Sequence, residues 1–283
     1  MAGSNTMTTT EHTDGRGNRP NLEREGPDVA EFIELTNEGD VRVLTLDAPH
    51  RRNALDRAML AELSEAIDTV AHDSSARALV VTGRDKAFCA GADLGSLFGD
   101  TTRPTSTLRD QLRETYSRFL PLRELTIPTV SAVNGVAVGA GINIALACDV
   151  VVAGPRAKFA VTFADIGLHP GGGCSWFLAR RMGPGRALAA ILGGAQIGAQ
   201  EALSSGIADI LADEPLDHAL QLAQRYASLD PELVKDATHA VRMSMYADLP
   251  DVLQYEAWAQ AASVGREGFQ RYLEAFDARS SRE

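Results

Sequence analysis

The chain has 283 residues with 27 basic and 38 acidic side chains, a formal net charge of −11, and 45% hydrophobic residues. This composition is typical of a globular protein with a large core, and the acidic balance argues against nucleic acid as a partner. No apolar run approaches the roughly 20 residues of a membrane span, and the N-terminus has no apolar stretch of the signal-peptide type. Three cysteines without metal-type spacing suggest neither a metal site nor a disulfide framework, so we expect a cytoplasmic protein.

Apolar periodicity predicts the elements in chain order. Residues 1–28 are polar and nearly free of large apolar side chains, which predicts a disordered tail. Two short strands are expected within residues 32–46, then a helix over 56–73 and a buried strand over 78–82. There follow a glycine-punctuated loop (residues 83–99), a helix (108–122), a strand (129–133), a glycine-rich turn (134–141), a helix (142–148) and a strand (149–153).

The repeated order of strand, turn, helix and strand predicts an α/β protein with parallel pairing. After residue 184 the pattern changes to helices, at residues 186–192, 199–205, 216–229, 231–245 and 252–276. We therefore expect three parts: a tail over residues 1–28, an α/β core over 29–200 and a C-terminal helical region over 201–283.

Two glycine-bordered segments, residues 86–94 and 133–143, carry the strongest chemical signal. Each can expose backbone N–H groups, and the second leads into a helix N-terminus. One N–H from each segment, converging on one oxygen, would stabilise an oxyanion; alternatively, both are only tight turns. The glycines do not form a dinucleotide fingerprint, because its third position is Ile144, and neither a P-loop nor a nucleophile elbow is present.

Six segments, in this order and spacing, resemble the crotonase or enoyl-CoA hydratase/isomerase superfamily over about residues 32–276. They are residues 46–55, 86–94, 128–141, 148–149, 166–173 and 199–206. The resemblance implies a crotonase-like spiral of β-β-α units with a C-terminal helical region, assembled as a homotrimer that often pairs into a hexamer. It also implies a lyase or isomerase of fatty-acid metabolism, with an acyl-coenzyme A thioester as substrate and no permanently bound cofactor.

By the same resemblance, the backbone N–H groups of Ala92 and Ala140 form the oxyanion hole. The segments that bind coenzyme A in the family correspond here to His50, Arg51, Arg52, Ala54, Ala90, Asp93 and Leu94. Arg51 and Arg52 suit charge-assisted bonds to the coenzyme phosphates, although such a pair also suits a solvated turn.

The resemblance breaks at the acid–base positions. Family hydratases activate water with two glutamates, whose positions fall here on Asn143 and Phe163. Asn143 can hydrogen-bond a water but cannot take its proton, and Phe163 can do neither, so we expect hydration far below that of a two-glutamate enzyme. His169 and Asp165 lie nearby as candidate acid–base groups, although both residues also suit solvated loop positions.

The sequence thus leaves three functions open. The first is an enzyme of the hydratase/isomerase type that stabilises an enolate. The second is a non-catalytic acyl-CoA binder or carrier. The third is a different enolate reaction, namely isomerisation, C–C cleavage or decarboxylation, that uses His169.

Overall fold

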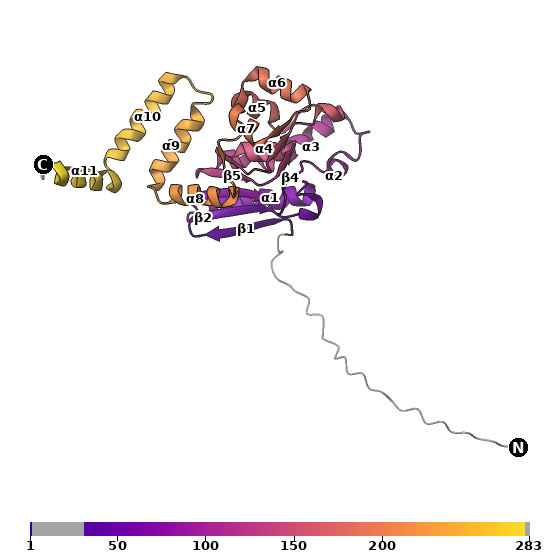
Figure 1. Cartoon of the computed structure of the whole chain (residues 1–283), viewed down its shortest axis with the longest axis horizontal. Coiled ribbons are helices and arrows are strands. Elements are labelled where there is room, and N and C mark those ends of the chain that lie inside the picture. Colours follow the sequence, from indigo (N-terminus) through magenta and orange to yellow (C-terminus); the bar gives the residue numbers. More distant parts are fainter. Residues whose placement is uncertain (2–30, 281–283) are drawn as a thin grey trace.

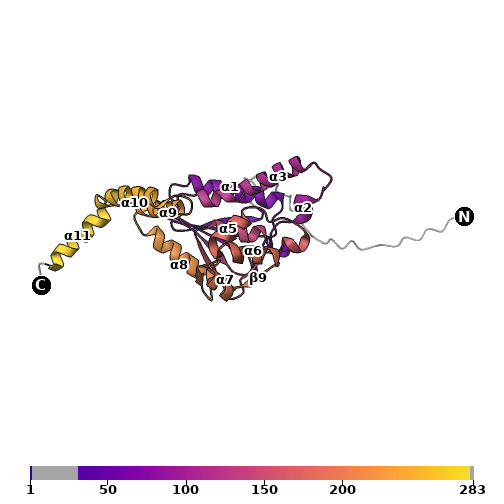
Figure 2. The same cartoon turned by 90° about the horizontal axis from the view of Figure 1, so that it is seen from above.

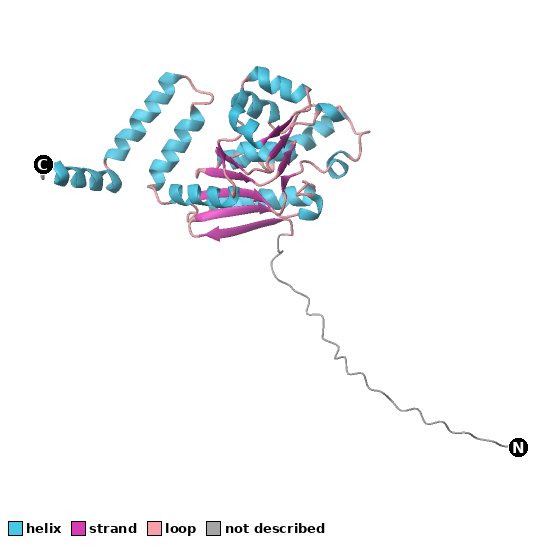
Figure 3. Ribbon diagram, in the orientation of Figure 1, coloured by secondary structure: helices cyan, strands magenta, loops and turns pink. Residues whose placement is uncertain are grey.

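A computed structural model of the chain describes Met1 and residues 31–280. Apart from Met1, the tail predicted over residues 1–28 lies outside the described residues. Two sheets with helices around them form an α/β body, from which the last helices project (Figures 1 and 3). The strands are β1 (Ile33–Glu38), β2 (Val41–Leu46), β3 (Ala78–Gly83), β4 (Ala87–Cys89), β5 (Thr129–Val133), β6 (Val136–Val138), β7 (Val150–Ala153), β8 (Lys158–Ala160), β9 (Gln196–Gly198) and β10 (Ile210–Leu211).

The larger sheet has the order β1-β2-β3-β5-β7-β10, and every pair except β1–β2 is parallel. The smaller sheet has the order β4-β6-β8-β9. Strand β3 is buried along its whole length, as expected of a strand covered on both faces. The expected parallel α/β architecture is therefore confirmed.

Helices follow pairs of strands in a repeating pattern. Strands β3, β5 and β7 each enter the larger sheet, the next strand of each enters the smaller sheet, and one or more helices follow. This repetition is the predicted spiral of β-β-α units. The helices are α1 (Arg57–His72), α2 (Leu94–Phe98), α3 (Thr105–Ser117), α4 (Ala140–Ala147), α5 (Cys174–Met182), α6 (Pro184–Leu192), α7 (Ala199–Ser205), α8 (Pro215–Ala227), α9 (Pro231–Met243), α10 (Leu249–Val264) and α11 (Glu267–Ser280), with short 3-10 helices η1 (Pro49–Arg51), η2 (Leu120–Glu124) and η3 (Ala164–Ile166).

The centre of the body is packed around α4. All residues of this helix from Gly141 to Ala147 are buried, and most are small or aliphatic. Gly141 needs to be glycine, because a Cβ there would lie 2.9 Å from the Cβ of Cys89. The small side chains let the helix lie close to the backbone of neighbouring segments, which fixes its N-terminal end in the molecule.

The predicted boundary at residue 200 falls inside the body. Strand β10 pairs with β7 in the larger sheet, and α8 packs against β3 and β5. The chain leaves the body with α9, and the helix predicted over residues 252–276 is interrupted after Val264, giving α10 and α11. We call α9–α11 the C-terminal arm; Figures 1 and 2 show it reaching away from the body.

A bidentate ion pair fastens the arm to the body. Arg242 on α9 donates from Nε and Nη2 to the two carboxylate oxygens of Asp149, both at 2.7 Å. Asp149 in turn accepts hydrogen bonds from the backbone N–H and hydroxyl of Thr129 at the start of β5.

Among the described residues, no helix is both long and apolar enough to cross a membrane.

Candidate oxyanion site and acyl cavity

A cavity of about 230 Å³ lies beside the N-terminal end of α4. The 90–92 loop, helices α2 and α3 and the 162–172 segment enclose it. Of the side chains that line it, only those of Tyr116 and His169 titrate, and none is a carboxylate. Its apolar lining comes from Leu55, Leu60, Leu94, Leu97, Phe98, Leu112, Phe119, Phe163, Ile166 and Leu168.

The backbone around Ala92 leaves its N–H without an internal acceptor. Ala92 forms an isolated parallel bridge with Leu55. In this bridge the Leu55 N–H donates to the Gly91 carbonyl at 2.8 Å, and the Leu55 carbonyl accepts from the Asp93 N–H at 2.9 Å. Both bonds involve the residues that flank Ala92, so its own N–H is turned away from Leu55. That N–H donates no hydrogen bond within the described part of the chain.

Ala140 is the first residue of α4, and its N–H belongs to the unpaired group at a helix N-terminus. Gly139 precedes it with φ +51°, a backbone conformation that residues other than glycine rarely adopt. The Gly139 N–H donates to the Ala160 carbonyl at 3.1 Å. The Ala140 N–H has no hydrogen-bond acceptor among residues 31–280. The positive end of the helix dipole adds to its attraction for a negatively charged oxygen.

Backbone contacts bring these two amides to the same cavity. Gly91 has φ +88°, and a Cβ placed on it would lie 2.5 Å from the Val138 carbonyl oxygen and 3.7 Å from the Ala140 nitrogen. Ala92 and Ala140 both line the cavity. Two N–H groups without internal acceptors, from separate segments, thus lie beside one largely apolar cavity.

The two residues expected at the positions of the family glutamates, Asn143 and Phe163, also line this cavity. Asn143 is 1% exposed; its Nδ2 donates to the Gly171 carbonyl at 2.8 Å, while its buried Oδ1 has no partner among the described residues. Phe163 packs its ring against Gly139, where a Cβ would lie 3.4 Å from the ring. This wall of the cavity is therefore apolar apart from one amide oxygen.

The structure separates the two other acid–base candidates. His169 lines the cavity, although it is exposed, and its Nδ1 lies 2.7 Å from the Pro170 carbonyl oxygen. If Nδ1 carries the proton, Nε2 is left as an acceptor. Asp165 does not line the cavity: its carboxylate lies beside Gly194, where a Cβ would be 2.7 Å from the Asp165 Cγ.

The two segments that correspond to the coenzyme site run side by side. The Ala90 N–H donates to the Arg52 carbonyl at 3.0 Å, so residues 52–55 lie along residues 90–93. Ala90 and Leu94 line the cavity, while His50 and Ala54 belong to the turn beside it. Asp93 has a local role, because its Oδ1 accepts the Ser96 N–H at 2.8 Å and caps α2.

The two arginines of the turn differ in their surroundings. Arg51 forms an ion pair with Asp56, and its guanidinium lies 4.6 Å from the centre of the Phe32 ring. Burial of Asp56 opposes its ionisation, but the hydrogen bond and charge of Arg51, together with backbone N–H donors at the start of α1, outweigh burial and lower the pKa of Asp56. Arg52 is exposed, and its guanidinium has no partner within residues 31–280. Of the two, Arg52 is the one free to meet an anion.

Tyr116 is a cavity residue that the sequence analysis missed. Its hydroxyl lies so close to Gly171 that a Cβ there would have no room. The phenol is protonated at neutral pH in any case, and burial raises its pKa further above the ordinary value. Leu112, Tyr116 and Phe119 recur at near-helical spacing, and this apolar stripe is the signal that could have directed attention to it.

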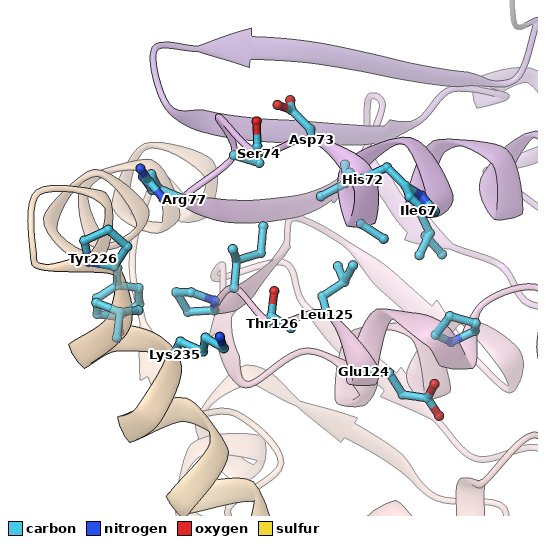
Figure 4. A pocket seen from close by; sticks show the side chains of 18 of the residues that line it. Ile67, His72, Asp73, Ser74, Arg77, Glu124, Leu125, Thr126, Tyr226 and Lys235 are labelled. Carbon is cyan, nitrogen blue, oxygen red and sulfur yellow. The ribbon is translucent and has the colours of Figure 1, made fainter. Parts of the chain in front are cut away.

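A second cavity, of about 560 Å³, separates the C-terminal end of α1 from the junction of α8 and α9 (Figure 4). It contains none of the residues that the sequence analysis singled out. Asp73 is bound by Arg42 at 2.6 Å, and Lys235 lies 3.5 Å from Glu232. The charges of Asp73 and Lys235 are thus matched by neighbours, while Ala92, Ala140 and Asn143 line the smaller cavity.

Comparisons with known proteins decide the family. The sequence model described as enoyl-CoA hydratase/isomerase matches residues 36–280. The chain belongs to this family. It is 41% identical over 225 residues to a probable enoyl-CoA hydratase of Mycobacterium tuberculosis, covering 78% of this chain and 86% of that protein. It is 34% identical to the 1,2-epoxyphenylacetyl-CoA isomerase of Escherichia coli, covering 87% of this chain and 96% of that protein.

A solved structure extends the match to three dimensions. It is a putative enoyl-CoA hydratase from Thermobifida fusca in complex with CoA, with a TM-score of 0.74 and 30% identity over 83% of this chain and 93% of that chain. The family resemblance identified from the sequence motifs is thereby confirmed.

Proposed function

We propose that the protein binds acyl-CoA thioesters and polarises the thioester carbonyl through the N–H groups of Ala92 and Ala140. The observation that carries this proposal is the pair of unpartnered amides at one apolar cavity. Such donors act most strongly where water is excluded and negative charge develops, as on the oxygen of a thioester enolate. Membership of the enoyl-CoA hydratase/isomerase family and the CoA-bound relative from Thermobifida fusca support the thioester as ligand.

The coenzyme would lie along the turn at residues 50–54 and the 90–94 segment. Arg52 is suited to the phosphates, because its guanidinium is exposed and unpaired in the described structure. Arg51 is less available, since Asp56 neutralises it. We therefore assign phosphate binding to Arg52 and a supporting role in the turn to Arg51. Coenzyme A enters here as part of the substrate, with no permanently bound cofactor.

The reaction differs from ordinary water addition. No carboxylate lines the cavity, and Asn143 and Phe163 occupy the positions of the water-activating glutamates. We propose a lyase or isomerase of fatty-acid metabolism that works on the stabilised enolate and hydrates enoyl-CoA slowly. Two specific observations favour alternatives: the apolar lining suits a non-catalytic acyl-CoA carrier, and His169 at the cavity suits isomerisation, C–C cleavage or decarboxylation.

Calorimetry with acyl-CoAs, coupled to a turnover screen, tests these assignments. The wild type should bind octanoyl-CoA, Arg52→Gln should weaken binding several-fold with a smaller salt dependence, and Arg109→Gln on the exposed face of α3 should change neither. Absence of binding to any acyl-CoA would contradict the proposal. Binding without turnover favours the carrier, whereas turnover that His169→Ala abolishes, with binding intact, favours the histidine-dependent reaction.

We further propose that the protein forms a homotrimer, or a hexamer of two paired trimers, in which the C-terminal arm packs on a neighbouring copy. The arm projects from the body and exposes large apolar side chains, including Leu249 at 69% and Trp258 at 62% (Figures 1 and 2). Exposed apolar surface of this extent is typical of an interaction site. Light scattering coupled to gel filtration should give three or six copies, and a monomer at micromolar concentration would contradict the assembly.

A further inference from the structure

Asn53 is a polar side chain buried beneath the turn at residues 48–55. It is 0% exposed, and its Oδ1 accepts the Ala48 N–H at 2.9 Å. Its Nδ2 donates to three carbonyls on the segment that runs from the end of β3 into β4, those of Arg84, Ala87 and Phe88 at 3.1, 2.9 and 3.2 Å. Both polar atoms of this amide therefore have partners inside the body, as a buried polar group requires.

Asn53 lies between two backbone contacts that hold the turn to the 90–92 loop. On one side, the Arg52 carbonyl accepts from the Ala90 N–H at 3.0 Å. On the other side, the Leu55 N–H donates to the Gly91 carbonyl at 2.8 Å. Since β4 leads directly into the 90–92 loop, the Asn53 side chain fastens the turn to the same strand that presents this loop.

The pairing register of the two segments decides whether the Ala92 N–H is free. In the observed register, the Leu55 carbonyl accepts from the Asp93 N–H at 2.9 Å. A slip by one residue, which would pair Leu55 with Gly91, would direct the Ala92 N–H onto the Leu55 carbonyl. Asn53 opposes such a slip, because its amide binds carbonyls at fixed places before the 90–92 loop.

The backbone of the turn also needs support from side chains. Arg52 and Asn53 have φ of +56° and +57°, in the left-handed region that residues other than glycine rarely adopt. Asparagine tolerates this region better than most residues, whereas arginine has no such preference. The hydrogen bonds of the Asn53 side chain hold this pair of residues in place, and they thereby set the position of Arg52.

We propose that Asn53 is a positioning residue of the thioester site. It does not line the acyl cavity. Its side chain holds the turn in the register that leaves the Ala92 N–H free, and it keeps Arg52 beside the 90–94 segment. This inference rests on the proposed binding of acyl-CoA, and it adds to the site a residue that acts from outside the cavity.

Asn134 offers a matched control, because it binds the same connection between β3 and β4 without reaching the turn. Its Nδ2 donates to the carbonyls of Gly83 and Asp85 at 2.7 and 2.8 Å. Loss of either amide should loosen this connection, but only the loss of Asn53 should change how Leu55 pairs with Ala92.

The carbonyl stretch of saturating octanoyl-CoA, labelled with ¹³C at the thioester carbon, reports the Ala92 donor in each variant. Asn53→Asp keeps an acceptor for the Ala48 N–H but places a second oxygen against carbonyl oxygens. It should lose about half of the shift of the bound band, because one of two donors turns away. Calorimetry should show octanoyl-CoA binding weakened about tenfold. Asn134→Ala should keep the full shift, even where urea unfolding shows it to be less stable than the wild type.

Asn53→Gly is a second variant that removes the amide while accepting the positive φ. It should lose the same part of the shift. A folded Asn53 variant that no longer binds octanoyl-CoA, beside an Asn134→Ala that does, would also support the positioning role.

The contrary outcomes separate this inference from the proposed function. A full shift in the folded Asn53 variants, or an equal loss in Asn134→Ala, would overturn the positioning role and leave the proposed function standing. Failure of both Asn53 variants to fold would also overturn it, since Asn53 would then serve the stability of the body. A wild type that binds no acyl-CoA, or binds it without a shift, would overturn the proposed function as well.

Discussion

Gly91 and Val138 lie in such close contact that a Cβ on Gly91 would stand 2.5 Å from the Val138 carbonyl oxygen. With φ at +88°, Gly91 is also in a conformation that other residues rarely adopt. Gly91→Ala should therefore lower the free energy of unfolding by at least about 1–3 kcal/mol. It should also weaken acyl-CoA binding, because the loop that presents the Ala92 N–H would be displaced. Urea unfolding and calorimetry measure the two effects.

Gly95→Ala is the matched control for this substitution. Gly95 lies within α2 and has the Asp93 carboxylate oxygen at 3.5 Å as the closest contact of a built Cβ. Alanine is favoured over glycine in a helix, so this variant should be as stable as the wild type or more so. If Gly91→Ala and Gly95→Ala unfold at the same urea concentration, the close contact between Gly91 and Val138 would be contradicted.

The hydratase activity of the wild type should be low. General acid and base groups each contribute about 10²–10⁴-fold to a rate, and the cavity offers no carboxylate for either role. A steady-state assay on crotonyl-CoA and on longer enoyl-CoAs should therefore give turnover at least about 10²-fold below a two-glutamate hydratase measured alongside. Equal turnover would refute the roles that we give to Asn143 and Phe163.

The attachment of the C-terminal arm should depend on Arg242. Its side chain is 16% exposed and forms two hydrogen bonds to Asp149, so Arg242→Gln should destabilise the protein by about 1.5–3 kcal/mol. Hydrogen exchange should then accelerate in α9–α11 before it does in the body. Arg109→Gln, where the ion pair with Asp110 is 65% exposed, should stay within about 0.5 kcal/mol of the wild type. A similar loss in both variants would contradict the role of the partly buried Arg242–Asp149 pair.

Cys89 beside the oxyanion loop should make stability depend on alkaline pH. Burial raises the pKa of its thiol to about 12, against about 8.5 in an unfolded chain. Because the folded state holds the proton more tightly, the wild type should lose stability as pH rises above about 8.5, by up to about 1.4 kcal/mol per pH unit from this thiol. Urea unfolding at pH 7 to 10 gives the free energy of unfolding of the wild type and of Cys89→Ala. The difference between these two free energies should change only above about pH 8.5. A constant difference would indicate an accessible thiol.

Much of the larger sheet could be predicted from the sequence. The strand predicted over residues 129–133 coincides with β5, because the segment lies between Pro128 and a glycine-rich turn. The helix predicted over residues 199–205 coincides with α7, because glycines bound it on both sides; both signals are local. The smaller sheet was not predicted. Strands β4, β6 and β8 have three residues each, too few to show an alternation, and their pairing depends on segments far apart in the chain.

At the candidate site, motifs indicated the loops but not the side chains that depend on tertiary contacts. The two glycine-bordered segments are visible in the sequence, and the family resemblance indicated Ala92 and Ala140 within them. Tyr116 lies on a helix remote in sequence from those segments, and periodicity cannot tell which cavity a helix face covers. The difference between Arg51 and Arg52 likewise depends on the ion pair between Arg51 and Asp56, which forms only when η1 and α1 are folded together.

The carbonyl stretch of a bound acyl-CoA labelled with ¹³C at the thioester carbon tests the oxyanion site most directly. Two N–H donors should move this band to lower wavenumber in the complex than in free solution. Ala140→Pro removes one N–H at the first helical position, where proline is tolerated, and should reverse part of the shift; Ala140→Gly keeps the N–H and should retain it. The same wavenumber in free and bound ligand, or a full shift of the band when the ligand is bound to Ala140→Pro, would contradict the proposed oxyanion site.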